Sequence, residues 1–225
     1  MRAPISVIIP TLNAEFSLQD CLGALMEGLE AGLIRELIVT DGGSTDATGA
    51  IAQAWGAEVL HGAPSRGGQL RRGCAQAKAE WLLVLHADTV LQAGWSKVVH
   101  AHMIKEHRAG WFHLRFDRGG FAANFVAGWA NLRSRFGLPY GDQGLLIPSA
   151  LYAQVGGYAD QPLMEDVAIA GALKGKLIAL DAVAQTSANK YLSQGWLRRG
   201  SRNLWTLIRY FAGADASVLA ASYRR

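Results

Sequence analysis

Three clusters of polar residues each follow a short run of apolar residues in the first part of the chain. The clusters are Pro10–Asn13, Asp41–Asp46 and His86–Asp88, and the apolar runs before them are Ile5–Ile9, Leu37–Val39 and Trp81–Leu85. In open α/β sheets, ligands bind in the crevice beyond the carboxyl ends of the strands. If the three runs are parallel strands, the clusters converge on one edge of the sheet. That arrangement favours a nucleotide site over a purely structural role.

Asp88 is the residue of these clusters best suited to hold a metal ion. Proteins hold Mg²⁺ or Mn²⁺ with one or two carboxylates, while phosphate oxygens and waters complete the coordination shell. We therefore predict that Asp88 holds a divalent cation together with a diphosphate, whose negative charge the cation neutralises. His86 could be a further ligand, a donor to phosphate or a histidine satisfied within the fold, and we favour a role other than metal ligation.

Arginines near residue 70 are candidates to contact the same diphosphate. Residues 61–73 are rich in glycine and arginine, and we predict that they form a loop leading into a helix. Arg66, Arg71 and Arg72 could approach the phosphates from this loop, although a solvated arginine face is the more common outcome.

The elements that must position these residues alternate between strand and helix up to about residue 110. This alternation is typical of a parallel, doubly wound sheet flanked by helices. We expect Asn13 to cap the first helix and Ser44, Thr45 and Asp46 to cap the second. The expected apolar stripe of the first helix consists of Leu18, Cys21, Leu22, Leu25, Met26 and Leu29.

The pattern changes in the second half of the chain. Residues 111–116 alternate as a strand, and residues 145–147 read as another strand after a Gly-Asp-Gln-Gly turn. Between them, large apolar residues recur at helical spacing: Phe121, Phe125, Trp129, Leu132 and Phe136. A further helix is predicted over residues 167–174.

Composition indicates a globular, cytoplasmic protein. Half of the 225 residues are hydrophobic and 18% are charged, so the chain can bury a sizeable core. Cys21 and Cys74 show no metal-binding spacing and read as core residues in a reducing compartment. We expect neither a signal peptide nor a spanning helix, because the apolar runs are too short.

The C-terminal segment has a charge of its own. Residues 190–225 hold seven basic residues against one acid, Asp215. On a helical wheel of residues 196–211, the apolar and the basic residues occupy opposite halves. Such a helix suits an anionic membrane surface, and it equally suits a helix docked on the domain with a solvated basic face. The first interpretation predicts a protein located peripherally at the inner face of the membrane.

Four segments together resemble family 2 glycosyltransferases of the GT-A fold, in the same order and spacing over most of residues 4–175. The segments are SVIIPTLN (6–13), TDGGSTD (40–46), HAD (86–88) and Glu165-Asp166. The wording of LHADT, YGDQG and LMED is similar to that of a compact bacterial subgroup. The resemblance implies an enzyme of the hexosyltransferase type that transfers a sugar from a nucleotide-diphosphate donor with inversion at the anomeric carbon.

The resemblance assigns the donor side of the site. It implies that Asp41 hydrogen-bonds the base, although Thr40 stands where the family usually has a second aspartate. Asp88 matches the last acid of the metal motif, with Ala87 beside it and His86 in place of the first acid. The residues implied to line the base and ribose are Pro10, Thr11 and Asn13, with Glu15 as an addition.

The resemblance also assigns the acceptor side. Asp166 matches the general base, and Glu165 would position it, although two acids at a helix start also complement the helix dipole. Asp142 and Gln143 are expected to border the donor sugar or acceptor. Lys190 could add a positive charge at the leaving group. The segment around it departs from the family's Gln-x-x-Arg-Trp motif, which argues against a processive, polymer-making role.

The sequence therefore predicts one GT-A domain over residues 1–190, with a nucleotide half to about 110 and an acceptor half from 111, and a basic tail over 191–225. We expect a UDP- or GDP-sugar donor, an Mg²⁺ or Mn²⁺ cofactor, an acceptor that is lipid-linked or membrane-associated, and no nucleic-acid partner. Two alternatives stay open: a sugar-phosphate nucleotidyltransferase, and a nucleotide-sugar binding module without catalysis.

Overall fold

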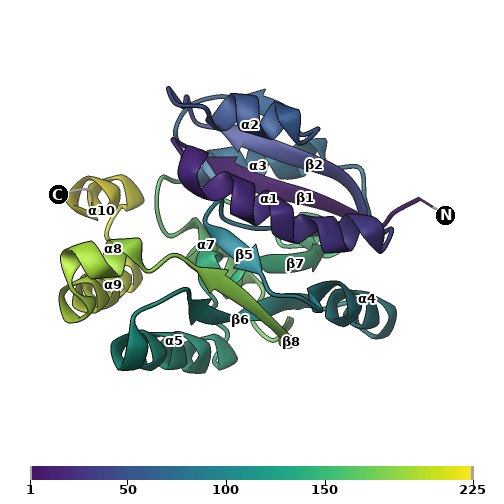
Figure 1. Cartoon of the computed structure of the whole chain (residues 1–225). Coiled ribbons are helices and arrows are strands. Elements are labelled where there is room, and N and C mark those ends of the chain that lie inside the picture. The colour runs from purple at the N-terminus through teal and green to yellow at the C-terminus, as the bar shows by residue number, and fades with distance from the viewer. Residues whose placement is uncertain (1, 224–225) are drawn as a thin grey trace.

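The computed structural model describes residues 2–223 and contains one mixed sheet of eight strands in the order β3-β2-β1-β4-β7-β6-β8-β5 (Figure 1). Neighbouring strands are parallel from β3 to β4 and between β6 and β8, and β7 and β5 run antiparallel to their neighbours. The strands are β1 (Ile5–Thr11), β2 (Ile34–Asp41), β3 (Glu58–His61), β4 (Trp81–Val84), β5 (Thr89–Leu91), β6 (Ala109–Phe116), β7 (Leu145–Pro148) and β8 (Leu177–Thr186).

Helices cover both faces of this sheet. One apolar core lies between the sheet and α1, α2 and α4, and a second lies between the sheet and α3, α6 and α7. The helices are α1 (Glu15–Glu30), α2 (Thr48–Ala54), α3 (Arg66–Gln76), α4 (Trp95–Lys105), α5 (Gly120–Arg135), α6 (Ser149–Gln154), α7 (Glu165–Ala172), α8 (Asn189–Gln194), α9 (Trp196–Phe211) and α10 (Ala216–Tyr223). The predicted doubly wound α/β architecture is confirmed.

Strand β1 runs two residues further than its sequence predicts. The Ile8 carbonyl accepts a hydrogen bond from the Leu85 N–H, which follows β4. Pro10 lies two residues further, so its nitrogen, which has no hydrogen, faces the same side, where β4 has already ended. The ladder to β2 continues, because Thr11 still accepts a bond from Gly42. Proline therefore costs this strand no hydrogen bond.

The start of α1 differs from the prediction, and the start of α2 agrees with it. Asn13 does not cap α1: its φ is +50°, and the cap position is Ala14, without a side-chain hydrogen bond. Within α1, Met26 and Leu29 of the predicted apolar stripe are exposed. The Trp95 ring packs instead against Gly28, where a Cβ would come within 2.5 Å of the ring. Asp46 does act at the start of α2, where it accepts a hydrogen bond from the Thr48 N–H.

Helix α3 begins at Arg66, so the prediction of a loop over residues 61–73 is wrong for residues 66–73, although a helix does follow. The helix begins after Ser65, whose hydroxyl accepts a hydrogen bond from the Gly68 N–H. Gly67 allows the backbone of residues 159–161 to cross the helix, because a Cβ at Gly67 would lie 2.1 Å from the carbonyl oxygen of Ala159. Close backbone contact, and not loop flexibility, accounts for this glycine.

Helices α5 and α9 turn their large apolar side chains away from the domain. The buried face of α5 is made of Ala123, Ala127, Ala130 and Ser134. In α9 the described side chains that are buried are Thr206 and Leu207. Helix α9 thus docks on the domain through Trp196 and Leu207, while most of its apolar half is exposed. Among the helices of residues 2–223, none is long and apolar enough to cross a membrane.

Candidate active site

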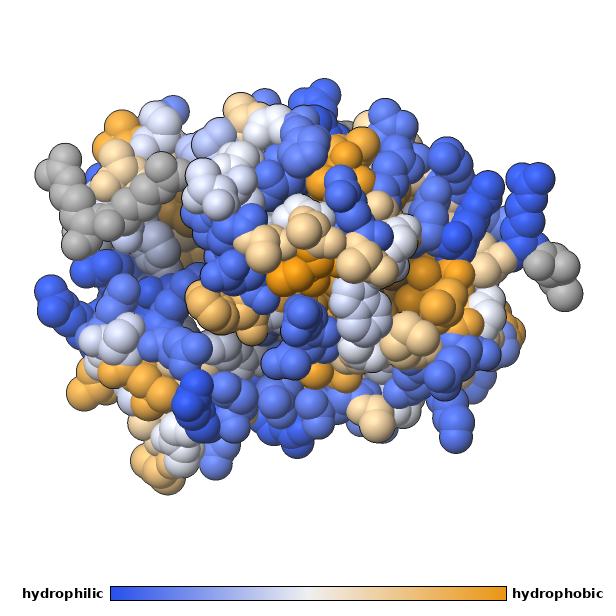
Figure 2. Space-filling model, turned by 45° about the horizontal axis from the view of Figure 1, so that its top comes forward, coloured by the Kyte–Doolittle hydropathy of each residue, from blue (hydrophilic) through white to orange (hydrophobic). Residues whose placement is uncertain are grey.

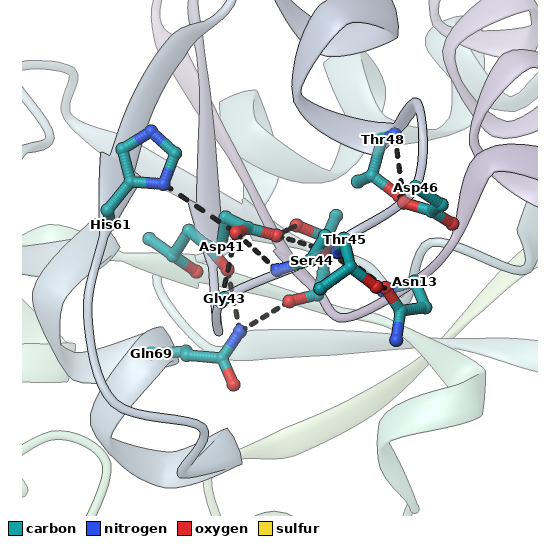
Figure 3. Close-up of polar contacts among 11 residues, drawn as sticks. Asn13, Asp41, Gly43, Ser44, Thr45, Asp46, Thr48, His61 and Gln69 are labelled. Atoms are coloured by element: carbon teal, nitrogen blue, oxygen red, sulfur yellow. Dashed lines mark hydrogen bonds and ion pairs between the residues drawn. The ribbon is translucent and has the colours of Figure 1, made fainter.

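The carboxyl ends of β1, β2 and β4 lie at one edge of the sheet, as their parallel pairing requires, and the polar clusters that follow them meet there. Asp41, at the end of β2, is 2% exposed. Its Oδ2 accepts hydrogen bonds from the N–H groups of Gly43 (2.9 Å) and Ser44 (2.8 Å), and its Oδ1 accepts from the hydroxyls of Thr11 (3.1 Å) and Ser44 (Figure 3). Burial alone would raise the pKa of Asp41, but these donors hold it below its usual value.

The loops after β1 and β2 are tied to each other. The Asn13 side-chain oxygen accepts a hydrogen bond of 2.9 Å from the Thr45 N–H, and the Asn13 N–H donates to the Ser44 hydroxyl at 2.8 Å (Figure 3). Buried Gln69 of α3 donates to the carbonyl oxygens of Thr11 and Thr40 at 2.8 and 2.7 Å. Sequence reasoning missed Gln69, because nothing in its helical context separates it from a solvated glutamine.

Glu15 has a structural partner in this region. One oxygen of its carboxylate accepts a hydrogen bond of 3.0 Å from the Ala47 N–H at the start of α2, while Asp46 accepts one of 3.2 Å from the Glu15 N–H at the start of α1. The two acids thus cap each other's helices. The structure gives Glu15 this capping role, and its predicted addition to the base pocket stays a prediction.

Asp166 is the second residue of α7 and lies near His86 of the same site. Its Oδ2 accepts a hydrogen bond from the Gly141 N–H and its Oδ1 from the Val167 N–H, both at 2.8 Å. The short 3₁₀ helix η1 (Gly141–Gln143) lies against the His86 ring. A Cβ at Gly141 would be 2.4 Å from His86 Nε2, so only glycine lets this turn approach. A pocket lined by His86, Tyr140 and Asp166, among others, lies between η1 and α7.

The acids of this cluster repel one another. Burial, together with the charges of Asp166 and Asp88, raises the pKa of Asp142 to about 6, although Arg133 opposes the shift. Burial and the charge of Asp166 raise the pKa of Glu165 to about 7. Glu165 is 1% exposed, and neither of its oxygens accepts a hydrogen bond within residues 2–223. Such unpaired buried acids are typical of functional sites.

The surroundings of His86 favour its neutral imidazole form. Burial and the charge of Arg66 lower its pKa to about 4, although Asp88 and Asp166 favour the protonated form. A neutral ring carries no positive charge for phosphate. The structure thus argues against a cationic phosphate donor at this position.

The residues present fit a divalent cation held mainly by its substrate. In the described part of the chain, the Asp88 carboxylate has no hydrogen bond or ion pair, and buried Asp142 Oδ1 has no partner. No three His, Cys, Asp or Glu side chains of residues 2–223 are grouped to hold an ion. A single free carboxylate matches Mg²⁺ or Mn²⁺ completed by phosphate oxygens and water.

Of the four predicted cations, Arg66 and Lys190 act on this site, and Arg71 and Arg72 lie elsewhere. Arg66 Nε lies 3.7 Å from Glu165 Oε1. The positive charges of Arg66 and Lys190 both lower the pKa of His86. The charge of Arg71 acts on Tyr152 of α6 and is not among the charges that act on His86. The prediction that Arg71 approaches the diphosphate is therefore not supported. Arg72 packs its guanidinium against Gly62.

The prediction that Gln143 borders the donor or acceptor is wrong. The side chain is 0% exposed: its oxygen accepts hydrogen bonds from Ser134 Oγ and the Tyr140 N–H, and its nitrogen donates to Asn131 Oδ1 and the Phe112 carbonyl. Gln143 holds η1 onto β6 and α5.

A neighbour that the sequence did not reveal is Arg133 of α5, whose guanidinium carbon lies 3.3 Å from the centroid of the Tyr140 ring.

The family model described as Glycosyl transferase family 2 matches residues 6–123. Curated relatives described as PGL/p-HBAD biosynthesis glycosyltransferases, from Mycobacterium bovis and Mycobacterium tuberculosis, are 35% identical over 115 residues. The match covers 48% of this chain and 44% of each relative, so the chain spans less than half the length of the curated relatives it matches.

Two solved structures have similar folds. S. aureus TarS 1-349 in complex with UDP-GlcNAc matches with a TM-score of 0.64 at 16% identity, over 82% of this chain and 58% of that chain. Glucosyl-3-phosphoglycerate synthase from Mycobacterium tuberculosis, in complex with Mn²⁺, UDP and glucosyl-3-phosphoglycerate, matches with a TM-score of 0.59 at 21% identity, over 82% and 70% of the respective chains.

Proposed function

The chain belongs to glycosyl transferase family 2 and has the GT-A fold, and we propose that it transfers a sugar from a UDP- or GDP-sugar to an acceptor hydroxyl with inversion at the anomeric carbon. The observation that carries this proposal is that Asp41 and Asp88 follow the parallel strands β2 and β4 at one edge of the sheet, while the charges of Asp88 and Asp166 both act on Asp142. The structures of TarS with UDP-GlcNAc and of the synthase with Mn²⁺ and UDP support a nucleotide-sugar donor.

The donor's nucleoside is proposed to bind at the joined loops after β1 and β2. Pro10 and Asn13 form the rim, and Thr11 holds the Asp41 carboxylate in place. Because Asp41 already accepts four hydrogen bonds, its first effect is to fix the loop on which the base rests. The hydrogen bonds from Gln69 keep the two strand ends together, so the site is formed before the ligand arrives.

The diphosphate is proposed to lie beyond β4, next to Ala87 and Asp88. Asp88 would hold the divalent cation, which when bound supplies positive charge to the leaving nucleoside diphosphate. Arg66 and Lys190 flank the same position and add charge-assisted contacts to phosphate oxygens. His86 is neutral and packs on Gly141, so it shapes the site between Asp88, which would hold the cation, and Asp166, the proposed general base.

Asp166 is proposed to act as the general base. The acceptor hydroxyl oxygen forms the new bond to the anomeric carbon as the bond from that carbon to the diphosphate oxygen breaks, and the hydroxyl proton passes to Asp166. Its carboxylate is partly exposed and is oriented by the Gly141 and Val167 N–H groups, as a positioned base requires. Asp142 is proposed to border the acceptor or the donor sugar, and Glu165 to position Asp166.

The basic helix over residues 194–212 extends the proposal to the acceptor. Its exposed apolar half and its arginines suit an anionic membrane surface, so we propose a lipid-linked or membrane-associated acceptor and a peripheral location at the inner face of the membrane.

Donor turnover tests the proposed reaction. With the UDP- or GDP-sugar that binds and Mn²⁺, we expect slow donor hydrolysis by the wild type and a loss of about 10² to 10⁴-fold in Asp166→Asn, with nucleotide binding kept. Asp181→Asn, at an exposed position of β8, is the matched control and should turn over like the wild type. Donor binding without turnover in the wild type would instead support the catalytically inactive binding module.

A further inference from the structure

Helices α5 and α9 present an apolar surface that the domain does not cover. On α5 its members are between 47 and 87% exposed: Phe121, Phe125, Trp129, Leu132 and Phe136. On α9 they are between 47 and 84% exposed: Leu197, Leu204, Trp205, Ile208 and Phe211. These ten residues are called the outer apolar surface. Isolated exposed apolar residues are common in soluble proteins, but stripes along two helices mark an interaction site.

The two stripes belong to one end of the molecule. Helix α5 contacts α9, and the two lie together at the left of Figure 1, at the opposite side from α4. Phe116 of β6 makes edge-on contacts with Tyr191 and Trp196, which fixes the start of α9 beside α5. Gly119 allows this contact, because a Cβ there would be 2.3 Å from the Trp196 ring. Figure 2 shows orange side chains at this lower left end of the molecule, among blue ones.

Cationic side chains accompany the outer apolar surface. Arg118 precedes α5 with a side chain that is 60% exposed, although Asp117 lies 3.5 Å from it. Arg198 of α9 is exposed, and Arg202 and Arg209 of the same helix are partly exposed. Helix α9 itself contains no acidic residue. Apolar residues that include tryptophans, next to arginines, match the boundary between acyl chains and anionic head groups.

The same helices form walls of the acceptor side of the site. Arg133 of α5 lies over the Tyr140 ring next to η1. Leu207, on the inner side of α9, packs with Met164 and Val167, which flank Glu165 and Asp166. A surface that binds α5 and α9 from outside is therefore adjacent to the acceptor side of the site.

We propose that the outer apolar surface, made by α5 together with α9, docks on an anionic phospholipid bilayer and turns the acceptor side of the site towards the membrane. The acceptor is then a lipid-borne hydroxyl that reaches Asp166 from the bilayer. The assignment of the acceptor rests on the proposed function, whereas docking does not. The requirement for α5 is the new element, because the sequence pattern indicated a membrane role for the terminal helix alone.

Vesicle flotation tests the role of α5. The full chain should float with vesicles of phosphatidylglycerol and phosphatidylcholine, and much less with phosphatidylcholine alone. The variant Phe121→Gln/Phe125→Gln/Leu132→Gln should lower the partition coefficient at least about tenfold, because three exposed apolar groups no longer insert. The control is Ile104→Gln on α4, whose side chain is 70% exposed away from this surface and which should float like the wild type.

Quenching of tryptophan fluorescence by brominated lipid gives a second measurement, in which α5 and α9 keep their apolar character. Quenching of the wild type should fall when either Trp129→Phe or Trp205→Phe is introduced, because both rings lie in the proposed docking surface. The proposal is overturned if the α5 variant floats like the wild type, if neither tryptophan contributes to quenching, or if the surface proves to join two copies that the α5 variant separates.

Donor hydrolysis without vesicles separates this proposal from the proposed function. Hydrolysis that survives in the α5 variant, together with lost flotation, supports docking as an independent property. Hydrolysis without flotation of the wild type would reject docking and leave the enzyme assignment standing. Flotation without hydrolysis would do the reverse.

Discussion

Glu165 is an acid that the fold buries beside another acid. Its nearest cation, Arg66, is 3.7 Å away and 44% exposed, which is too weak a partner to offset burial. We propose that Glu165, the neighbour of Asp166 in the chain, lowers the stability of the fold through its burial and in that place positions the Asp166 carboxylate.

Glu165→Gln should stabilise the protein at alkaline pH. The pKa of Glu165 is raised from 4.5 to about 7, so the native state binds the proton more tightly than the unfolded state, and the free energy of unfolding falls as pH rises between these values. Glutamine stays neutral. The variant should therefore exceed the wild type by about 1 to 3 kcal/mol at pH 8 and differ little at pH 4.

Urea unfolding at the two pH values measures this difference. Glu58→Gln, at an exposed position on β3, is the control and should change the free energy of unfolding little at either pH. A Glu165→Gln variant that is less stable than the wild type at pH 8 would show that Glu165 is held ionised by its surroundings.

The candidate site could be predicted from sequence where a side chain follows a strand, and not where its partner comes from elsewhere. Asp41 and Asp88 were found because the apolar runs before them predict the strands that they follow. Arg133 was not, since it reaches the site from a helix whose pattern shows only amphipathicity. Gln143 was misjudged because a polar residue between glycines looks exposed, whereas Ser134 and Asn131 supply it with buried partners.

At the scale of the elements, helical periodicity found α5 and α9 but not their orientation. Periodicity predicts two unlike faces, and a globular core usually takes the larger apolar side chains. In α5 the alanine face packs on the domain instead, which lets the helix approach β6 closely. The predicted GT-A fold and the amphipathic terminal helix are confirmed. The direction in which the apolar faces of α5 and α9 point could be determined only from the structure.

Helix η1 depends on one glycine for its place over His86. Gly141→Ala would put a methyl group 2.4 Å from His86 Nε2, so the turn that orients Asp166 must shift. We expect a loss of about 1 to 3 kcal/mol in the free energy of unfolding and a loss of donor turnover. Circular dichroism and the turnover assay measure both effects.

Gly23→Ala is the matched control for this prediction. A Cβ at Gly23 of α1 meets no atom within 4 Å, so alanine there should stabilise the helix by about 0.5 to 1 kcal/mol and leave turnover unchanged. Equal behaviour of the two variants would mean that the contact between η1 and His86 has no importance for the site.

At the scale of the whole molecule, the two functions that we propose occupy different ends of one sheet. The proposed nucleoside site is at the ends of β1 and β2, where hydrogen bonds join the loops, and the outer apolar surface lies beyond β6 and β8. Asp88 and Asp166 stand between them. A donor would thus enter from solvent on one side while the acceptor arrives from a membrane on the other.

The most direct test of the central claim is a thermal-shift titration with UDP and GDP, with and without Mn²⁺. Binding to the folded state alone adds about 2.7 kcal/mol of stability at a hundredfold excess over Kd. We expect one nucleotide to raise the Tm, and Mn²⁺ to increase that rise in the wild type. Asp88→Ala should abolish the contribution of Mn²⁺, whereas His86→Ala should only weaken it. If neither nucleotide raises the Tm of the wild type under any metal condition, the account is contradicted at its centre.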